Sequence, residues 1–145
     1  MSIAISRLIE AQFLAHAKTC YPYECCGFIA GSQADSALSK ASYYLPCDNT
    51  LTEKTRRFLI DPLQYQSAED RADEEGLAII SIVHSHPDHS HDPSEFDRAH
   101  AWPGLSYIII SILEGRVNSY RSWQLRQDHS QFDGEDILME DESCR

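Results

Sequence analysis

Apolar and polar positions follow one another along this chain in a pattern that predicts an α/β domain with a mixed sheet of roughly six to eight strands. Runs of β-branched, aromatic and other apolar residues bounded by turn residues predict strands, and apolar residues on one helical face predict helices. Strands are expected at 3–5, on one edge of the sheet, and at 25–31, 41–45, 56–60, 77–84, 105–113, 117–123 and 137–139. Two main helices are expected at 6–18 and 62–75, the second opened by Asp61-Pro62 and closed by Gly76, and a short helix at 94–101.

The strand expected at 77–84 ends in two histidines, His84 and His86, which a polar loop follows. Side chains at i and i+2 of a strand point to the same face, about 6 to 7 Å apart along the backbone. The two imidazoles can therefore converge on one metal ion. The short helix that begins near Ser94 turns back toward this strand end, so Asp97 is a candidate third ligand with an anionic oxygen.

Two neutral imidazoles and one carboxylate suit zinc and leave a fourth tetrahedral position for water, as in a catalytic zinc site. A simpler interpretation stays open, because Ser94-x-x-Asp97 also resembles a capping box and paired histidines at a strand end can be polar surface. His89 and His91 lie in the same loop, so another ligand set or metal buffering by a His-rich tract is a further alternative.

Length and charge narrow the class of protein. A chain of 145 residues fits one domain with its own core, and a net charge of −11, from 12 basic and 23 acidic residues, argues against nucleic-acid binding. Seven of the acids follow residue 127, so we expect a domain over 1–127 and an acidic extension over 128–145. No run reaches the roughly 18 apolar residues of a membrane span and the N-terminus lacks a signal-peptide layout, so a cytoplasmic location away from membranes is expected.

The chain has five cysteines, an odd number, and its sequence shows no export signal. Reduced thiols are therefore expected rather than a disulfide framework. The cysteines are Cys20, Cys25, Cys26, Cys47 and Cys144. Cys25 and Cys26 are expected to be small buried residues of a strand. A role for either as a nucleophile with a histidine base is a weaker alternative, because no residue that would orient such a base is evident.

Glu24 together with the residues of the loop and short helix resembles the signature of the JAMM (MPN-plus) metalloprotease family. That signature is a glutamate near the N-terminus followed by H-x-H, seven residues and S-x-x-D, and here it is carried by Glu24, His84, His86, Ser94 and Asp97. The segment Pro22-Tyr23-Glu24-Cys25-Cys26-Gly27 is also similar to the family's P-x-E-x-C-G, and the likeness covers about residues 3–124. The resemblance implies a cytidine-deaminase-like MPN/JAMM fold.

The same resemblance implies a role for each residue. His84, His86 and Asp97 would bind one zinc ion, with water as the fourth ligand. Glu24 would take a proton from that water and later deliver it to the departing amine, while zinc and the Ser94 hydroxyl would hold the oxyanion. Glu24 taken by itself, without the family, reads more simply as a surface carboxylate.

The family likeness extends to a substrate class. The short chain is similar to prokaryotic members that cleave ubiquitin-like sulfur-carrier proteins after a C-terminal Gly-Gly, and a narrow groove beside the metal would explain a preference for glycine. Pairing into a homodimer also belongs to what the resemblance implies. A non-catalytic MPN scaffold or interaction module is the main alternative, since some relatives have lost the metal ligands.

Overall fold

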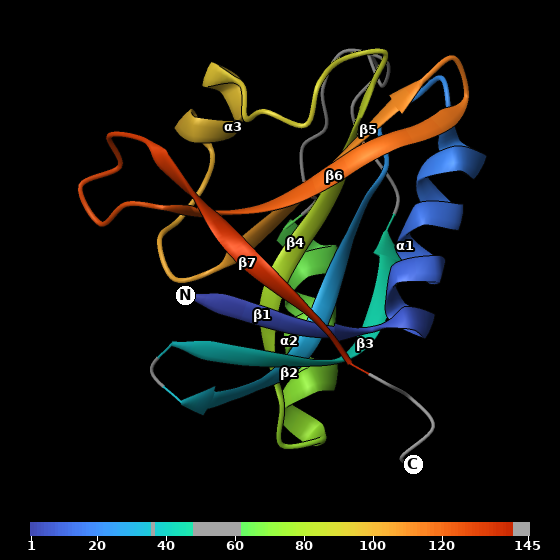
Figure 1. Cartoon of the computed structure of the whole chain (residues 1–145). Coiled ribbons are helices and arrows are strands. Elements are labelled where there is room, and N and C mark those ends of the chain that lie inside the picture. The colour runs from blue at the N-terminus through green and yellow to red at the C-terminus, as the bar shows by residue number, and fades with distance from the viewer. Residues whose placement is uncertain (36, 48–61, 141–145) are drawn as a thin grey trace.

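A computed structural model describes residues 1–35, 37–47 and 62–140 of the chain. Within these ranges seven strands close into a barrel and three helices are added to it (Figure 1). The strands are β1 (Ser2–Ser6), β2 (Cys26–Asp35), β3 (Leu38–Cys47), β4 (Ala78–Pro87), β5 (Ser106–Leu113), β6 (Arg116–Leu125) and β7 (Phe132–Glu140). The helices are α1 (Arg7–Cys20), α2 (Pro62–Glu74) and α3 (Glu95–Ala99), so the expected α/β class with two main helices and a short one is confirmed.

The sheet is mixed, with the order β1-β3-β2-β4-β5-β6-β7, and β7 returns to β1. β1 is parallel to β3 and β7, β4 is parallel to β5, and the other neighbours are antiparallel. The expectation that 3–5 forms an edge strand is wrong, because β1 has a partner on each side. Its burial explains this position, since Ile3, Ala4 and Ile5 are all buried.

The acidic C-terminal segment contributes a full strand to the barrel. β7 is antiparallel to β6 and parallel to β1, and it extends well beyond the expected 137–139. Ile137 and Met139 pack against the core beneath α1, while Asp136 and Leu138, which alternate with them along the strand, are exposed. Residues 132–140 therefore lie within the sheet, whereas the charge pattern placed the end of the domain at residue 127.

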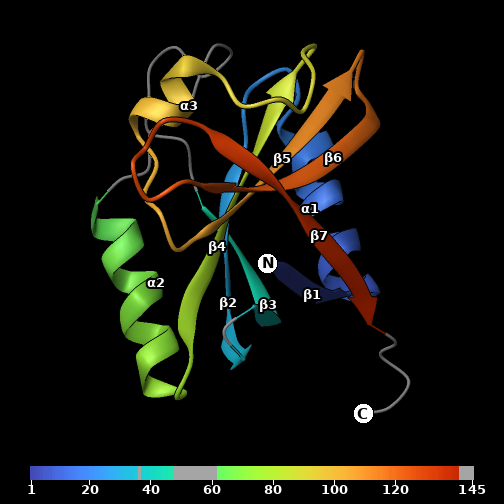
Figure 2. The same cartoon turned by 60° about the vertical axis from the view of Figure 1, so that its left-hand side comes forward.

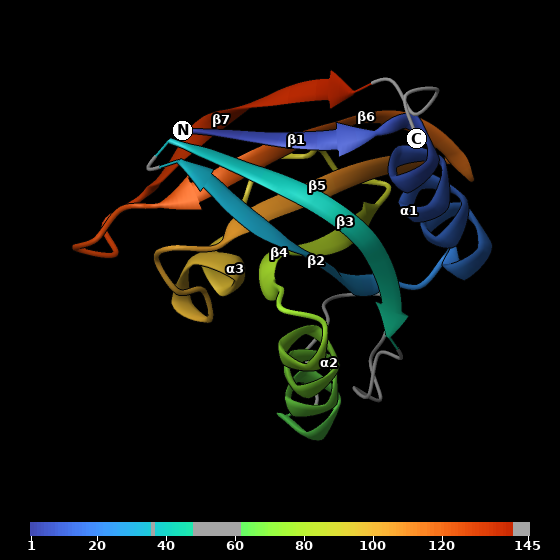
Figure 3. The ribbon, with the colours of Figure 1, turned by 90° about the horizontal axis from the view of Figure 1, so that it is seen from below.

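The two main helices lie on opposite sides of the strands β2 and β4 (Figures 2 and 3). α1 begins at the N-cap Ser6, whose Oγ accepts a hydrogen bond of 3.1 Å from the Ile9 amide, and it buries Phe13 in the first core cluster. α2 presents the small residues Ala68 and Ala72 to a second cluster between itself and the sheet. Neither helix, nor α3, combines the length and the apolar run that crossing a membrane requires within the described part of the chain.

The helix boundaries follow local signals closely. α2 begins at Pro62 and ends at Glu74, and Gly76 adopts a φ of 73° just beyond it, as a residue that closes a helix does. The strand expected at 56–60 and the N-cap Asp61 lie outside the described residues.

β4 is the central strand that positions the histidines. It pairs with β2 on one side and β5 on the other, and all of its residues except Ala78 are buried. In the register of these ladders His84 faces Cys26 of β2 and Ile109 of β5. Because hydrogen bonds on both sides fix the strand, the backbone that carries His84 and His86 is rigidly placed.

Candidate metal centre

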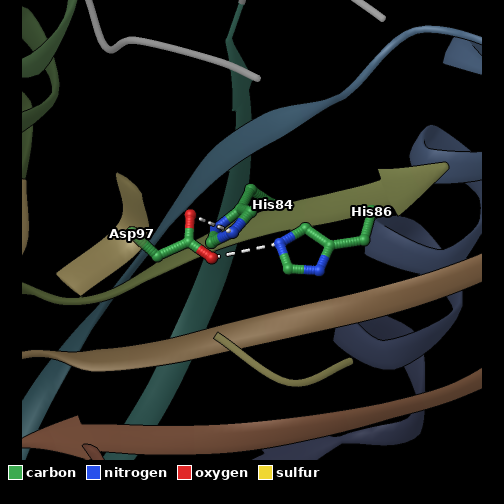
Figure 4. Close-up of side chains that lie close together, drawn as sticks. All are labelled: His84, His86 and Asp97. Carbon is green, nitrogen blue, oxygen red and sulfur yellow. Dashed lines mark hydrogen bonds and ion pairs between the residues drawn. The ribbon is translucent and has the colours of Figure 1, made fainter. Parts of the chain in front are cut away.

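His84, His86 and Asp97 meet where β4 approaches α3 (Figure 4). One ligand atom from each residue lies within 4.8 Å of the other two. Nε2 of His84 is 3.3 Å from Oδ1 of Asp97, and Nε2 of His86 is 3.1 Å from Oδ2 of the same carboxylate. The i, i+2 spacing on β4 therefore places both imidazoles on one face, opposite a single carboxylate.

A capping box at the start of α3 holds that carboxylate in place. The Asp97 amide donates to Ser94 Oγ at 3.0 Å, and the Ser94 amide donates to Asp97 Oδ2 at 2.8 Å. The interpretation of Ser94-x-x-Asp97 as a capping box is thus confirmed. It does not exclude a metal site, because the carboxylate that caps α3 also faces the histidines.

The hydrogen bonds of His86 indicate that a cation fits between its ring and Asp97. Its Nδ1 lies 2.8 Å from the carbonyl oxygen of Ser90, which only accepts, so Nδ1 carries a hydrogen. In the neutral ring Nε2 then directs a lone pair at Asp97 Oδ2, 3.1 Å away. Two acceptors at this separation in a buried site need a proton or a metal ion between them, and the donor set of two imidazoles and one carboxylate suits zinc.

Burial and neighbouring charge act in opposite directions on these groups. Burial lowers the pKa of His84 more than Asp97 raises it, which favours the neutral imidazole that a metal requires. Burial also lowers the pKa of His86, but the hydrogen bond and the charge of Asp97 outweigh it and leave that pKa raised. The pKa of Asp97 is well below its usual range, although burial alone raises it, because both histidines and the Ser94 amide stabilise the carboxylate.

Glu24 lies beside this cluster and is nearly buried, with 7% of its surface exposed. It lines a cavity of about 620 Å³ together with His86, Ser94 and Asp97, and the remaining lining residues are His89, Ser90, Asp92, Pro93 and Phe96. The interpretation of Glu24 as an ordinary surface carboxylate is therefore wrong. His84 instead faces a neighbouring apolar cavity of about 350 Å³, which Asp97 also borders.

Some features of the site carried no signal in the sequence. The Ser90 carbonyl that orients His86 is a backbone group, so no side-chain pattern could have marked it. The aromatic residues Trp102 and Tyr107 line the apolar cavity, and neither of them was assigned a role at the site from the sequence.

The other candidate ligands and nucleophiles from the sequence, His89, His91 and Cys25, do not belong to the His84, His86 and Asp97 cluster. His91 Nδ1 lies 2.8 Å from Ser119 Oγ, and its carbonyl accepts from Trp123 Nε1, so this residue is tied to β6. Among the described residues, the cluster of possible metal ligands includes neither His89 nor His91. Burial raises the pKa of the Cys25 thiol to about 12, so a nucleophilic thiolate is disfavoured there.

The barrel with a His-His-Asp cluster at the end of its central strand defines an α/β domain of the JAB/MPN kind. Residues 7–126 match the family model Prok-JAB, described as prokaryotic homologs of the JAB domain. The chain belongs to this family.

Two curated proteins are similar in sequence. The chain is 41% identical to the tail tip assembly protein K of Escherichia phage N15 over 107 residues, which is 73% of this chain and 40% of that protein. It is 32% identical to a desampylase of Haloferax volcanii over 100 residues, which is 68% of this chain and 69% of the relative. The chain thus spans well under half of the phage protein and about two thirds of the desampylase.

Solved structures agree with the fold. A solution structure of a protein from Desulfitobacterium hafniense has a TM-score of 0.84 and 27% identity, covering 97% of this chain and 94% of its own. A crystal structure of a JAB1/MPN domain protein from Archaeoglobus fulgidus has a TM-score of 0.54 and 19% identity, covering 93% of this chain and 98% of its own. The second likeness concerns the fold alone.

Proposed function

We propose that this protein is a zinc metallopeptidase that hydrolyses the peptide or isopeptide bond after the C-terminal Gly-Gly of a ubiquitin-like sulfur-carrier protein. The observation that carries the proposal is the convergence of His84, His86 and Asp97 within 4.8 Å, with Glu24 lining the same cavity as two of them. Family membership and the desampylase relative, which indicates isopeptide bonds of a ubiquitin-like protein as targets, support the reaction class.

In this proposal three residues hold the metal and two act on the substrate. Zinc bound by the His-His-Asp cluster would supply Lewis acidity and lower the pKa of a coordinated water. Glu24 accepts the proton released there and delivers it to the departing amine. The Ser94 hydroxyl, whose oxygen accepts from the Asp97 amide at the edge of the same cavity, donates to the oxyanion of the scissile carbonyl.

The cluster itself is kept in order by two backbone contacts. The Ser90 carbonyl fixes the tautomer and the orientation of His86, and the Ser94 amide fixes one oxygen of Asp97. Ligands held in this way need little rearrangement when a metal binds. Both contacts come from the loop between β4 and α3, so we assign this loop a positioning role.

The Gly-Gly specificity rests on the family likeness and on the shape that such a site requires. A tail that passes between a metal and a buried carboxylate has little room for side chains, which favours glycine on the acyl side of the bond. An extended tail can add backbone hydrogen bonds to an exposed strand or loop.

The test uses the full chain loaded with zinc and a panel of carrier proteins that extend past Gly-Gly by a short tail. Mass spectrometry of each carrier before and after incubation should detect loss of the tail directly after the second glycine. A chelator should abolish the cleavage, and added zinc should restore it. Cleavage at another bond, or cleavage that a chelator leaves intact, contradicts the proposal.

A second candidate is a non-catalytic module within a larger assembly. The observation that favours it is the 41% identity to the tail tip assembly protein K, of which this chain spans 40%. Under this hypothesis the domain binds a partner through its surface and cleaves no carrier. Absence of chelator-sensitive cleavage across the whole panel, with stable association with a tail protein, would favour the module over the peptidase.

A further inference from the structure

Two thiols face each other across neighbouring strands close to the candidate metal centre. Cys26 at the start of β2 and Cys47 at the end of β3 are partners in the antiparallel ladder, and their Sγ atoms lie 2.7 Å apart. Directly opposed residues in such a ladder have Cα atoms about 4.5 to 5.5 Å apart, within the range of about 4.4 to 6.8 Å that a disulfide spans. The two sulfur atoms can therefore bond without movement of the backbone.

The two thiols differ in access to solvent. Cys26 has none of its surface exposed, whereas Cys47 is partly exposed. A small oxidant in solution therefore meets Cys47 first, and Cys26 is the thiol positioned to resolve the product. Cys25, the residue just before β2, packs into the core cluster beneath α1, whereas the cross-strand partner of Cys47 is Cys26.

We propose that Cys26 and Cys47 form a reversible disulfide and are a redox modification site of this protein. The oxidant is a low-molecular-weight disulfide such as glutathione disulfide. Cys47 sulfur attacks it, which forms a mixed disulfide and releases one glutathione thiol. Cys26 sulfur then attacks the Cys47 sulfur and releases the second glutathione. Two protein thiols are oxidised, one glutathione disulfide is reduced to two thiols, and the two protons pass to the glutathiones.

The pair lies next to residues of the candidate metal centre, although the inference does not depend on the proposed function. Cys26 is two residues after Glu24, and it pairs across the β2 and β4 ladder with His84. The link would tie β2 to β3 where the chain that carries Glu24 enters the sheet. Reduced thiols are expected for this chain, and the structure adds that one pair is placed to respond when the thiol-disulfide balance shifts.

The test uses the full wild-type chain, incubated with excess glutathione disulfide and then alkylated. Intact mass spectrometry should show a form lighter by two hydrogen atoms in which two of the five thiols resist alkylation. Peptide mapping should find the link between Cys26 and Cys47, and dithiothreitol should reverse it. Retention of all five thiols, or a link that joins a different pair, overturns the proposal.

Single substitutions test the order of the two steps. A Cys26→Ser chain should accumulate glutathione bound to Cys47, because the resolving thiol is gone. The matched control, Cys20→Ser, removes another partly exposed thiol and should form the Cys26 to Cys47 link as the wild type does. Failure of the control to form the link, or glutathione bound mainly to Cys20 in the wild-type chain, argues against the assignment. Because the wild-type measurement needs no substitution, a variant that misfolds does not weaken the test.

Discussion

Asp97 contributes to two sets of contacts at once. Its carboxylate closes the capping box of α3 and at the same time lies 3.3 Å from His84 Nε2 and 3.1 Å from His86 Nε2. The position of the carboxylate is thus set by its own helix. This is the arrangement expected of a ligand in a preformed metal site.

The choice of ligands can be tested on the histidines of the adjoining loop. Replacing His89 and His91 together with alanine should leave zinc at about one ion per chain, because neither residue belongs to the cluster. Elemental analysis of the purified, zinc-loaded protein measures this ratio, with Asp97→Ala as the variant that should lose the metal. Loss of zinc from the double variant, or its retention by Asp97→Ala, would show that the ligands are assigned wrongly.

Asp88 provides a test of electrostatics at a single residue just past β4. The Glu114 amide and the Tyr21 hydroxyl donate to its carboxylate, which lowers the pKa of Asp88 below its ordinary value of 3.8. A lowered pKa stabilises the folded state above the pKa of the unfolded chain, and that stabilisation is lost as the pH falls. Asn tolerates the φ of 60° at this position, so Asp88→Asn removes mainly the charge.

The wild type should therefore have a higher Tm than Asp88→Asn at neutral pH, and the difference should shrink as the pH falls below 3.8. Thermal unfolding of the two chains across a pH series measures this. A difference that grows on acidification contradicts the account of this residue.

Among the elements, α3 depends most on a few local contacts. It has five residues, none of them buried, so its capping box contributes much of what fixes it. Ser94→Ala removes the hydroxyl that accepts from the Asp97 amide, and should lower the free energy of unfolding by about 1 kcal/mol. Because Asp97 then loses part of its support, zinc affinity should fall by roughly 10- to 100-fold.

The matched control for Ser94→Ala is Ser6→Ala, which removes the corresponding N-cap hydroxyl of α1. This variant should lose a similar amount of stability and keep the zinc affinity of the wild type. Competition titration with a chelating dye gives the affinities, and denaturant unfolding gives the stabilities. Equal zinc affinity in the two variants would mean that the cap of α3 does not position Asp97.

Local elements were largely predictable from the sequence, since their signals lie in adjacent residues. The helical pattern that begins at Ser6, the proline at the start of α2 and Gly76 at its end mark helix boundaries that the structure has within one or two residues. The spacing from His84 to Asp97 likewise placed the cluster on one strand and one short helix. Glu24 was different, because only the family likeness, and no local pattern, joined it to residues that follow it by sixty positions or more.

At the scale of the whole molecule, closure of the barrel was not predictable from the pattern of residues. It depends on β1, which joins β3 and β7 by parallel pairing between segments far apart in the chain. The extent of β7 was also not predicted from the charge pattern. Its acidic residues suggested a solvated extension, whereas Ile137 and Met139 pack against the core. Local periodicity indicates that a strand exists, but its partners are set by long-range packing.

The contribution of β7 to the fold gives a prediction at this scale. Ile137→Asp places a charge against the core and should lower the free energy of unfolding by about 2 kcal/mol or more. Leu138→Asp, at an exposed position of the same strand, should change it by only about 0.5 kcal/mol or less. Denaturant unfolding compares them. Equal effects would mean that β7 is an appendage, and a chain ending at residue 127 would then fold as stably as the full chain.

The central claim is that Glu24, a buried carboxylate, carries the proton at a metal ion held by His84, His86 and Asp97. The most direct measurement is zinc content and carrier cleavage determined side by side for Glu24→Gln and the wild type. Glu24→Gln should bind the same amount of zinc, yet lose about 10²- to 10⁴-fold in kcat, because the amide cannot carry the proton. Cleavage by Glu24→Gln at a rate near that of the wild type would contradict the claim, as would loss of the metal together with the activity.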